Sequence, residues 1–360
     1  RRAMSLIRRA KIVCNPSVKK PNSIIRRILA VPLQRAAQAN PALVLEGPRG
    51  SGKTTLLRQE FPRRLYISME DSADRRAART DPAAFLGRLR MPAIIDDVHR
   101  APELWRRLSQ TGPAHPLILA SPRRLSLPLP TLRLHHPTLA EREGRQPLPL
   151  DMLGRFTPSA NPYRRIASPW PAPRTSIERD VLDLVAVRDL DRFEAFRQTA
   201  FETSGESLDQ EALARRAGVS KTTAIRWLAV LEQCFETILL PQCDFPFGRR
   251  LMRSPRLHFL AGRSFASRVV SQIYRNAVHS GLEPDLRYWR DSNGMEVALV
   301  IQSPGAPPVP VAIAESPTPV DESRLRRWMS LAGVDSGAIV SARATGPLRN
   351  RIFNYNYIDL

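Results

Sequence analysis

The segment 47–54 has the residue types and spacing that proteins use to hold phosphate groups. Its sequence, GPRGSGKT, matches the pattern G-x-x-x-x-G-K-[ST] at every fixed position. Glycines let backbone N–H groups close around phosphate oxygens, and a helix that begins here adds positive potential. Lys53 is placed to reach the β- and γ-phosphates of a nucleotide, and the Thr54 hydroxyl can bind Mg²⁺. The segment therefore predicts a nucleotide site, with ATP and Mg²⁺ as its ligands.

The predicted nucleotide contacts include the whole loop, the next residue and one polar strand end. They are Gly47, Pro48, Arg49, Gly50, Ser51, Gly52, Lys53, Thr54, Thr55 and Ser121. Ser121 ends an apolar run and could sense the γ-phosphate, although serine is common at strand ends. The alternative, a Gly-rich turn with an unrelated lysine, is disfavoured because an apolar run precedes the loop and a helix can follow it.

An acidic pair, Asp96 and Asp97, ends the apolar run 93–97. In nucleotide hydrolases the first acid at such a position holds Mg²⁺, and the second orients or deprotonates the attacking water. We therefore predict Asp96 as a metal ligand, and Asp97 and Lys53 as catalytic residues. AAA-type enzymes usually have Glu at the second position, and misplacing a carboxylate by about one ångström can cost roughly a hundredfold in rate. Binding is expected to persist and turnover to be slow; a plain strand-end turn is the alternative.

An α/β scaffold is expected to position these residues. Apolar runs predict strands at 42–45, 64–69, 93–97 and 116–121. Helical patterns are present at 55–59, 82–89 and 102–108. Strands that alternate with helices predict a parallel sheet with helices on its faces, as in P-loop NTPases.

The segments that flank this pattern contain prolines. Residues 23–38 predict an amphipathic helix that is interrupted at Pro32. Residues 122–173 contain eleven prolines, which predicts a hinge or surface excursion with only short regular elements. Helical patterning resumes at Ser176 and extends to about residue 204.

Residues 211–232 have the spacing of a helix-turn-helix. Gly218 suits a left-handed turn, Ser220 can cap the second helix, and Leu228 and Leu231 are expected in the core. The residue types that enter a major groove occur near the start of the second helix. They are Lys221, Thr222, Thr223 and Arg226. Contact with DNA and a plain packing module are both open interpretations.

In these motifs the chain resembles a family of bacterial and archaeal AAA-superfamily ATPases. In this family an AAA-type domain precedes a C-terminal region of uncharacterised function. The matching stretches are GPRGSGKTTLL at 47–57, YISMED at 66–71, IIDDVHRAPELW at 94–105, SIERDVLDL at 176–184, LARRAGVSKTTAIRWLAVLE at 213–232 and RYWRDSNGMEV at 287–297. The resemblance implies a winged-helix-like unit at the helix-turn-helix, then a small α/β domain of restriction-endonuclease-like, or PD-(D/E)xK, type.

The chain departs from this family at the catalytic end of the nucleotide site. The family has Asp-Glu where this chain has two aspartates, and it has a Leu-Ala-Gly-Arg element after the strand that ends at Ser121. The arginine of that element is a plausible finger that acts on a neighbouring subunit. Arg123, Arg124 and Arg133 are the candidates to replace it, and the sequence assigns none of them.

The nuclease-like end lacks the residues that its active relatives need. Those relatives use an Asp after one strand and Glu-x-Lys on the next, because the carboxylates hold Mg²⁺ and the lysine steadies the phosphate. Here Ala298 stands at the aspartate position after Glu296, and residues 311–316 contain no Glu-x-Lys. Glu296 with Glu315 would hold Mg²⁺ poorly. No nuclease activity is expected.

The resulting division has five parts. They are a basic, flexible leader at 1–22, an AAA-type domain at 23–150, a Pro-rich linker at 151–175, a helical winged-helix-like domain at 176–243 and the nuclease-like domain at 244–360.

The overall charge is strongly positive, at +21. Ten of residues 1–45 are Lys or Arg and none is acidic, which allows nucleic-acid contact, a targeting peptide or a solvated leader. Cys14, Cys234 and Cys243 form no C-x-x-C pair and are expected to be reduced thiols. The apolar runs are shorter than the roughly 18 residues that cross a bilayer, so a soluble protein without membrane contact is expected. Reduced thiols indicate a cytoplasmic location.

Two functions from different classes are compatible with these features. The first is a slow, Mg²⁺-dependent AAA-type ATPase whose nucleotide state controls the later domains. The second is a nucleic-acid-binding or scaffold protein in which ATP is a structural ligand that is barely hydrolysed. A transcriptional regulator that acts through residues 211–232 is a third possibility. DNA, through the winged helix and the basic leader, and further copies of the chain are the expected partners.

Overall fold

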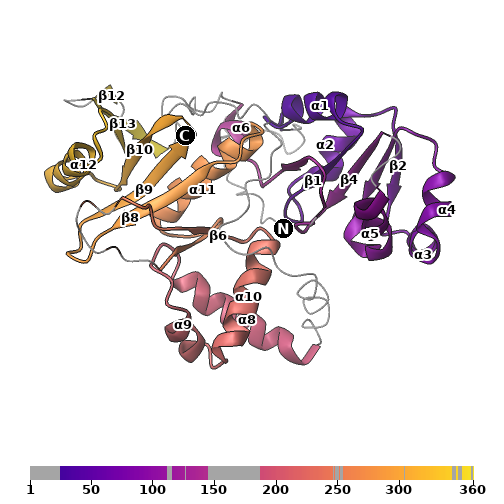
Figure 1. The fold of residues 1–360 in the computed structure, drawn as a ribbon, viewed down its shortest axis with the longest axis horizontal. Helices are drawn as coiled ribbons and strands as arrows, with labels where there is room; N and C mark the ends of the chain where they lie inside the picture. Colours follow the sequence, from indigo (N-terminus) through magenta and orange to yellow (C-terminus); the bar gives the residue numbers. More distant parts are fainter. Residues whose placement is uncertain are drawn as a thin grey trace, which may run out of the picture.

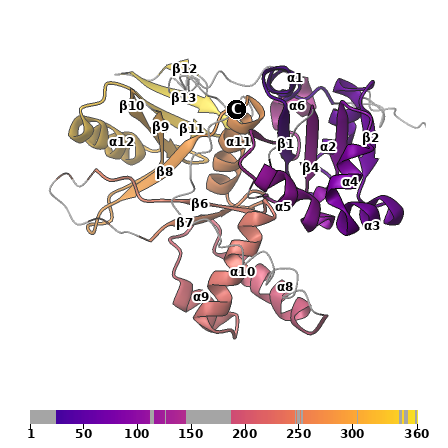
Figure 2. The ribbon, with the colours of Figure 1, turned by 45° about the vertical axis from the view of Figure 1, so that its right-hand side comes forward.

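The computed structural model describes residues 25–111, 116–125, 127–144, 187–245, 247, 251, 254–303, 305–342, 346–347, 351–357 and 360. They form an α/β unit that contains the predicted phosphate loop, a helical unit and a second α/β unit (Figure 1). The helical unit lies beneath and between the two sheets in both views (Figure 2). In the part of the chain that is described, no helix has the length and apolarity to cross a membrane.

The first unit is built on a five-stranded parallel sheet with the order β2-β3-β4-β1-β5. The strands are β1 (Ala42–Glu46), β2 (Leu65–Ser68), β3 (Ala93–Asp96), β4 (Leu117–Ser121) and β5 (Thr131–Arg133). Because all strands are parallel, their carboxyl ends meet at one edge, where open α/β sheets place their ligands. This is the predicted P-loop NTPase sheet.

Helices cover both faces of this sheet. They are α1 (Ala30–Ala39), α2 (Lys53–Glu60), α3 (Ser72–Thr80), α4 (Pro82–Gly87), the 3₁₀ turn η1 (Val98–Arg100), α5 (Pro102–Thr111) and α6 (Leu139–Glu143). Alternation along β1 explains the two layers: Leu43 and Leu45 pack against α1 and α2, whereas Ala42 and Val44 pack against α3, α4 and α5. Both cores are apolar and hold the strand ends in fixed register.

Three local expectations were wrong or incomplete. Helix α1 begins at Ala30 and is not interrupted at Pro32, because the first amides of a helix need no intrahelical acceptor. Helix α3 was not predicted; Asp71 caps it by accepting from two backbone amides. The Pro-rich span is no surface excursion in its described part: β5 joins the sheet, and Leu134 is fully buried.

The second unit confirms the helix-turn-helix. It contains α8 (Val187–Glu202), α9 (Gln210–Arg216) and α10 (Lys221–Gln233), followed by the antiparallel pair β6 (Thr237–Leu240) and β7 (Arg256–Phe259). Gly218 has φ +64°, and Ser220 Oγ accepts from the amide of Thr223 at 3.1 Å. A two-stranded antiparallel hairpin, β6 and β7, follows these three helices. The second strand of this hairpin, β7, lies past the expected domain boundary at residue 243. The predicted helix start at Ser176 lies outside the described residues.

The third unit is a six-stranded mixed sheet with the order β12-β13-β11-β10-β9-β8. Its elements are α11 (Phe265–His279), β8 (Asp285–Arg290), β9 (Glu296–Ser303), β10 (Ala306–Ile313), α12 (Pro319–Ala332), β11 (Gly337–Ser341), β12 (Gly346–Pro347) and β13 (Ile352–Asn356). Helix α11 packs on one face and α12 on the other. Tyr288 and Trp289 are both fully buried, which makes them core residues.

Candidate nucleotide-binding site

The predicted phosphate loop joins β1 to α2 at the carboxyl edge of the sheet. Gly47 leaves no room for a side chain, because a Cβ there would lie 1.9 Å from the carbonyl oxygen of Leu134. Gly50 has φ +72° and Gly52 has φ +94°, a region that L-residues rarely adopt. Gly52 caps α2, so the loop ends at a helix N-terminus. This backbone has the form that cradles an anion.

Lys53 lies beneath this loop. Its ammonium group donates to the carbonyl oxygens of Gly47, at 2.7 Å, and Pro48, at 3.0 Å. Burial lowers the pKa of Lys53, and the carboxylates of Asp96 and Asp97 oppose that shift. Within the described chain, the buried Ser51 Oγ has no hydrogen-bond partner. A buried cation and an orphaned hydroxyl in a glycine loop fit a phosphate ligand.

Asp96 lies at the end of β3 and is held by three donors. Thr54 Oγ1 and Tyr66 OH each donate to Asp96 Oδ2 at 2.6 Å, and the amide of Asp97 donates to Oδ1 at 2.9 Å. Burial raises the pKa of Tyr66 to about 12, and its hydrogen bond to Asp96 adds to the shift. The structure thus joins the two predicted Mg²⁺ ligands, Thr54 and Asp96, and this hydroxyl–carboxylate set fits a hard cation. Tyr66 was missed as a contact, although it begins the stretch YISMED.

Asp97 sits in a strained turn directly after the strand. Its backbone is left-handed, with φ +53° and ψ +36°, and its Oδ1 lies 3.7 Å from His99 Nδ1. Burial raises the pKa of Asp97, and the carboxylates of Asp96 and Glu70 raise it further. Burial, followed by the positive charge of Arg123 and other nearby cations, lowers the pKa of His99 to about 3. His99 is therefore neutral near pH 7.

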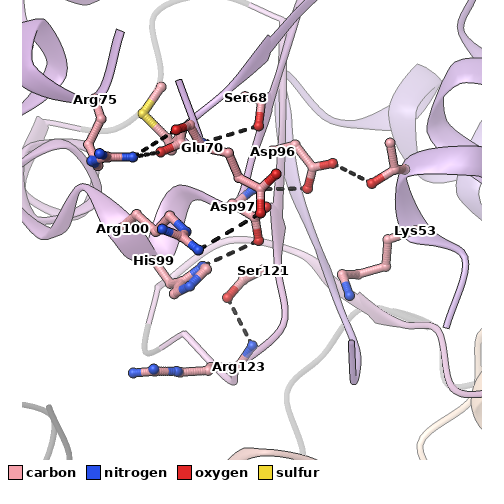
Figure 3. A network of polar contacts seen from close by, with 12 residues as sticks. Lys53, Ser68, Glu70, Arg75, Asp96, Asp97, His99, Arg100, Ser121 and Arg123 are labelled. Carbon is pink, nitrogen blue, oxygen red and sulfur yellow. Dashed lines mark hydrogen bonds and ion pairs between the residues drawn. The ribbon is translucent and has the colours of Figure 1, made fainter. Parts of the chain in front are cut away.

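Ser121 connects the neighbouring strand β4 to the loop. Its carbonyl accepts from the amide of Gly47 at 3.1 Å, and its buried Oγ accepts from the amide of Arg123 at 3.1 Å. Figure 3 shows Ser121 between Lys53 and His99, below the two aspartates. Arg49 and Thr55, which complete the predicted contact set, are exposed. All predicted residues of the nucleotide site thus lie on the loop, on α2 or at the ends of β3 and β4.

Arg27 is a functional candidate that sequence reasoning missed. Its guanidinium donates to the carbonyls of Ser51 and His135, both at 2.6 Å, and its Nε donates to Glu141 at 3.2 Å. The Glu141 carboxylate lies 3.2 Å from His279 Nδ1 on α11. The phosphate loop is thereby tied to α6 and to the third unit. A lone arginine in a basic segment gives no sequence signal for such a role.

The three arginines considered as fingers differ in their surroundings. Arg133 pairs with Glu283 of the third unit and lies 3.8 Å from Glu46. Arg124 pairs with Glu232 of α10 at 3.3 Å. These internal ion pairs leave Arg123, whose side chain has no ion pair with the described residues, as the freest of the three.

The candidate DNA-contacting residues begin α10. Lys221, Thr222 and Arg226 are exposed, and Thr223 is half-buried. Lys221 pairs with Glu211 of α9 at 2.6 Å, on the surface. Such an exposed pair is worth little and can be exchanged for a phosphate contact.

In the third unit, the acids considered for a metal are paired with arginines. Arg256 lies 2.5 Å from Glu296, and Arg268 lies 3.5 Å from Glu315. Across the described residues, no group of three or more His, Cys, Asp or Glu is arranged to hold a metal ion.

Comparisons with known proteins agree with the geometry of the first unit. Residues 39–115 match a family model described as an AAA domain, and residues 172–260 match a domain of unknown function (DUF8612). The match to the AAA model lies within the first unit, which has the parallel sheet and phosphate loop of a P-loop NTPase. No curated protein matches the chain.

Two solved structures of one bacterial protein are also similar. They are RuvB from Thermotoga maritima, a Holliday junction branch migration motor, and a point variant of it, with 17% and 18% sequence identity. Both matches cover 59% of this chain and 87% of the other, with a TM-score of 0.25. At that TM-score the likeness supports no argument about fold or function.

Proposed function

We propose that this protein is an ATP-binding AAA-type ATPase that hydrolyses ATP slowly with Mg²⁺. The observation that carries the proposal is the convergence of Lys53, Thr54 and Asp96 at the N-terminus of α2. Backbone amides of the loop and the Lys53 ammonium bind the phosphates. Mg²⁺, held by Thr54 and Asp96, would neutralise charge on the β- and γ-phosphates. Asp97, directly after β3, would help to orient the attacking water.

The state of the nucleotide is proposed to control the later units through the segment after β4. Ser121 bonds to both the loop and the amide of Arg123. The next residue, Arg124, donates through its amide to Gln233 at 3.2 Å and pairs with Glu232, both in α10. A shift of Ser121 toward a γ-phosphate would therefore pull on the helix-turn-helix.

Replacing Asp97 with glutamate separates a slow ATPase from a protein that only holds ATP. Asp97→Glu is expected to raise the single-turnover rate of ATP hydrolysis by roughly tenfold to a hundredfold, because the longer acid reaches the attacking water. The rate is measured with excess protein over radiolabelled ATP, and binding of the same nucleotide is measured in parallel. Tight binding with no gain in rate would instead support the alternative, in which ATP is a structural ligand.

Contact with DNA is a second proposed function, supported by the exposed basic start of α10. The double variant Lys221→Ala/Arg226→Ala is expected to weaken duplex binding. It should also reduce the slope of log affinity against log salt by about one for each phosphate that the protein no longer neutralises. Arg324→Ala/Arg327→Ala on α12 removes two exposed charges elsewhere and is the matched control. Equal affinity and slope in the Lys221→Ala/Arg226→Ala variant and the parent would remove α10 as a DNA contact.

A further inference from the structure

Glu70 emerges beside Asp97 at the carboxyl edge of the sheet. Strand β2 pairs in parallel with β3, with Ser68 opposite Asp96, and the amide of Met69 donates to the carbonyl of Asp96 at 2.9 Å. Glu70 follows directly, and its carboxylate lies 3.8 Å from Arg100, in the 3₁₀ turn that begins after Asp97. Figure 3 shows Glu70 next to Asp97, between Arg75 and Arg100.

A buried imidazole points to a ligand at the same place. The His99 side chain is only 8% exposed, and its Nδ1 lies 3.7 Å from Asp97 Oδ1, too far for a hydrogen bond. In the described residues that nitrogen has no hydrogen-bond partner. A buried polar atom without a partner destabilises the folded protein unless water satisfies it. This nitrogen can therefore form a hydrogen bond with a water that lies beside Asp97.

The Glu70 side chain is one methylene longer than that of Asp97. The Asp97 side chain is short, and its left-handed backbone fixes where that side chain begins. The Glu70 side chain is 61% exposed, and its ion pair with Arg100, at 3.8 Å, is loose. It can therefore turn over the end of β3 at little cost.

We propose that Glu70 is a second catalytic carboxylate, which orients the attacking water together with Asp97 and accepts its proton. This role rests on the proposed ATPase function. The water oxygen forms a bond to the γ-phosphorus, and one water proton passes to the Glu70 carboxylate. The bond from that phosphorus to the β–γ bridging oxygen breaks, and its electron pair leaves on ADP.

The test compares Glu70→Gln with two further variants, in single-turnover hydrolysis and in ATP binding. Glu70→Gln is expected to lower the hydrolysis rate by about 100-fold or more, with affinity for Mg-ATP changed less than about twofold. Asp71→Asn, the matched control at the neighbouring acid, keeps the cap of α3 and is expected to leave the rate unchanged. Adding Asp97→Glu to Glu70→Gln is expected to raise the hydrolysis rate of that variant at least about tenfold, because the longer acid at 97 can then orient the attacking water.

Each other outcome decides against the proposal. Hydrolysis by Glu70→Gln at the parent rate would overturn the role of Glu70. Tight ATP binding by the parent without hydrolysis would also overturn it, while nucleotide binding would stand. If Glu70→Gln lost both ATP binding and ATP hydrolysis, and Asp97→Glu did not restore them, Glu70 would have a structural role in the site and no role in the chemical step. A parent that does not bind ATP would remove the proposed function itself.

Discussion

Replacing Lys53 with alanine is expected to lower the affinity for Mg-ATP by about 100-fold or more. The Lys53 ammonium is buried under the phosphate loop, and it donates there to two carbonyl oxygens. Hydrogen bonds to a charged group contribute about 1.5–3 kcal/mol each, and two such bonds to phosphate oxygens account for that factor. Titration with a fluorescent ATP analogue measures the change.

The matched control removes a charge without touching the loop. Arg35 is exposed on α1, so Arg35→Ala is expected to bind nucleotide as the parent does. Far-ultraviolet circular dichroism shows whether each variant keeps its secondary structure. A folded Lys53→Ala protein with parental affinity would show that this lysine does not hold the phosphates.

Replacing Arg27 with methionine is expected to destabilise the first unit by about 3–5 kcal/mol. The variant leaves the fully buried Glu141 carboxylate without its arginine, and removing one partner of a buried ion pair has a cost of this size. It also removes the donors to the carbonyls of Ser51 and His135. A chain of several units has no single free energy of unfolding. The reduced stability of the first unit is therefore measured from the lowest-temperature transition in scanning calorimetry.

The neighbouring arginine provides the control for this experiment. Arg26 is exposed, so Arg26→Met is expected to change the free energy of unfolding of the first unit by no more than about 0.5 kcal/mol. Adding Glu141→Gln to Arg27→Met is expected to recover part of the loss, because the buried group is then neutral. If Arg27→Met melted like the parent, the contacts of Arg27 with the loop and Glu141 would contribute nothing to stability.

The parts of the site that lie on one continuous segment were predictable. The loop, the helix that follows it and the acids after β3 each have a local pattern, and the structure places them as expected. The helix-turn-helix was predicted for the same reason: Gly218, Ser220 and the apolar spacing all lie within one stretch. Patterns of this kind depend only on nearby residues and on the geometry of one helix or strand.

The contacts that join distant segments were not predictable. Arg27 reaches Glu141 across 114 positions, and Tyr66 reaches Asp96 across 30. Glu70 lies beside Asp97 only because β2 pairs with β3. The short strand β5 was expected to be an excursion, since prolines dominate its surroundings. Pairing with β1 and burial of Leu134 decided its place, and neither has a local signal.

Nucleotide binding at the phosphate loop is the central property of the proposed function. Isothermal titration of the unaltered protein with Mg-ATP tests this, with Lys53→Ala titrated under the same conditions. We expect one ATP to bind per chain with a dissociation constant well below about 1 mM, and we expect Lys53→Ala to lose this binding. No heat of binding, and no protection against thermal unfolding, at millimolar Mg-ATP would contradict this expectation.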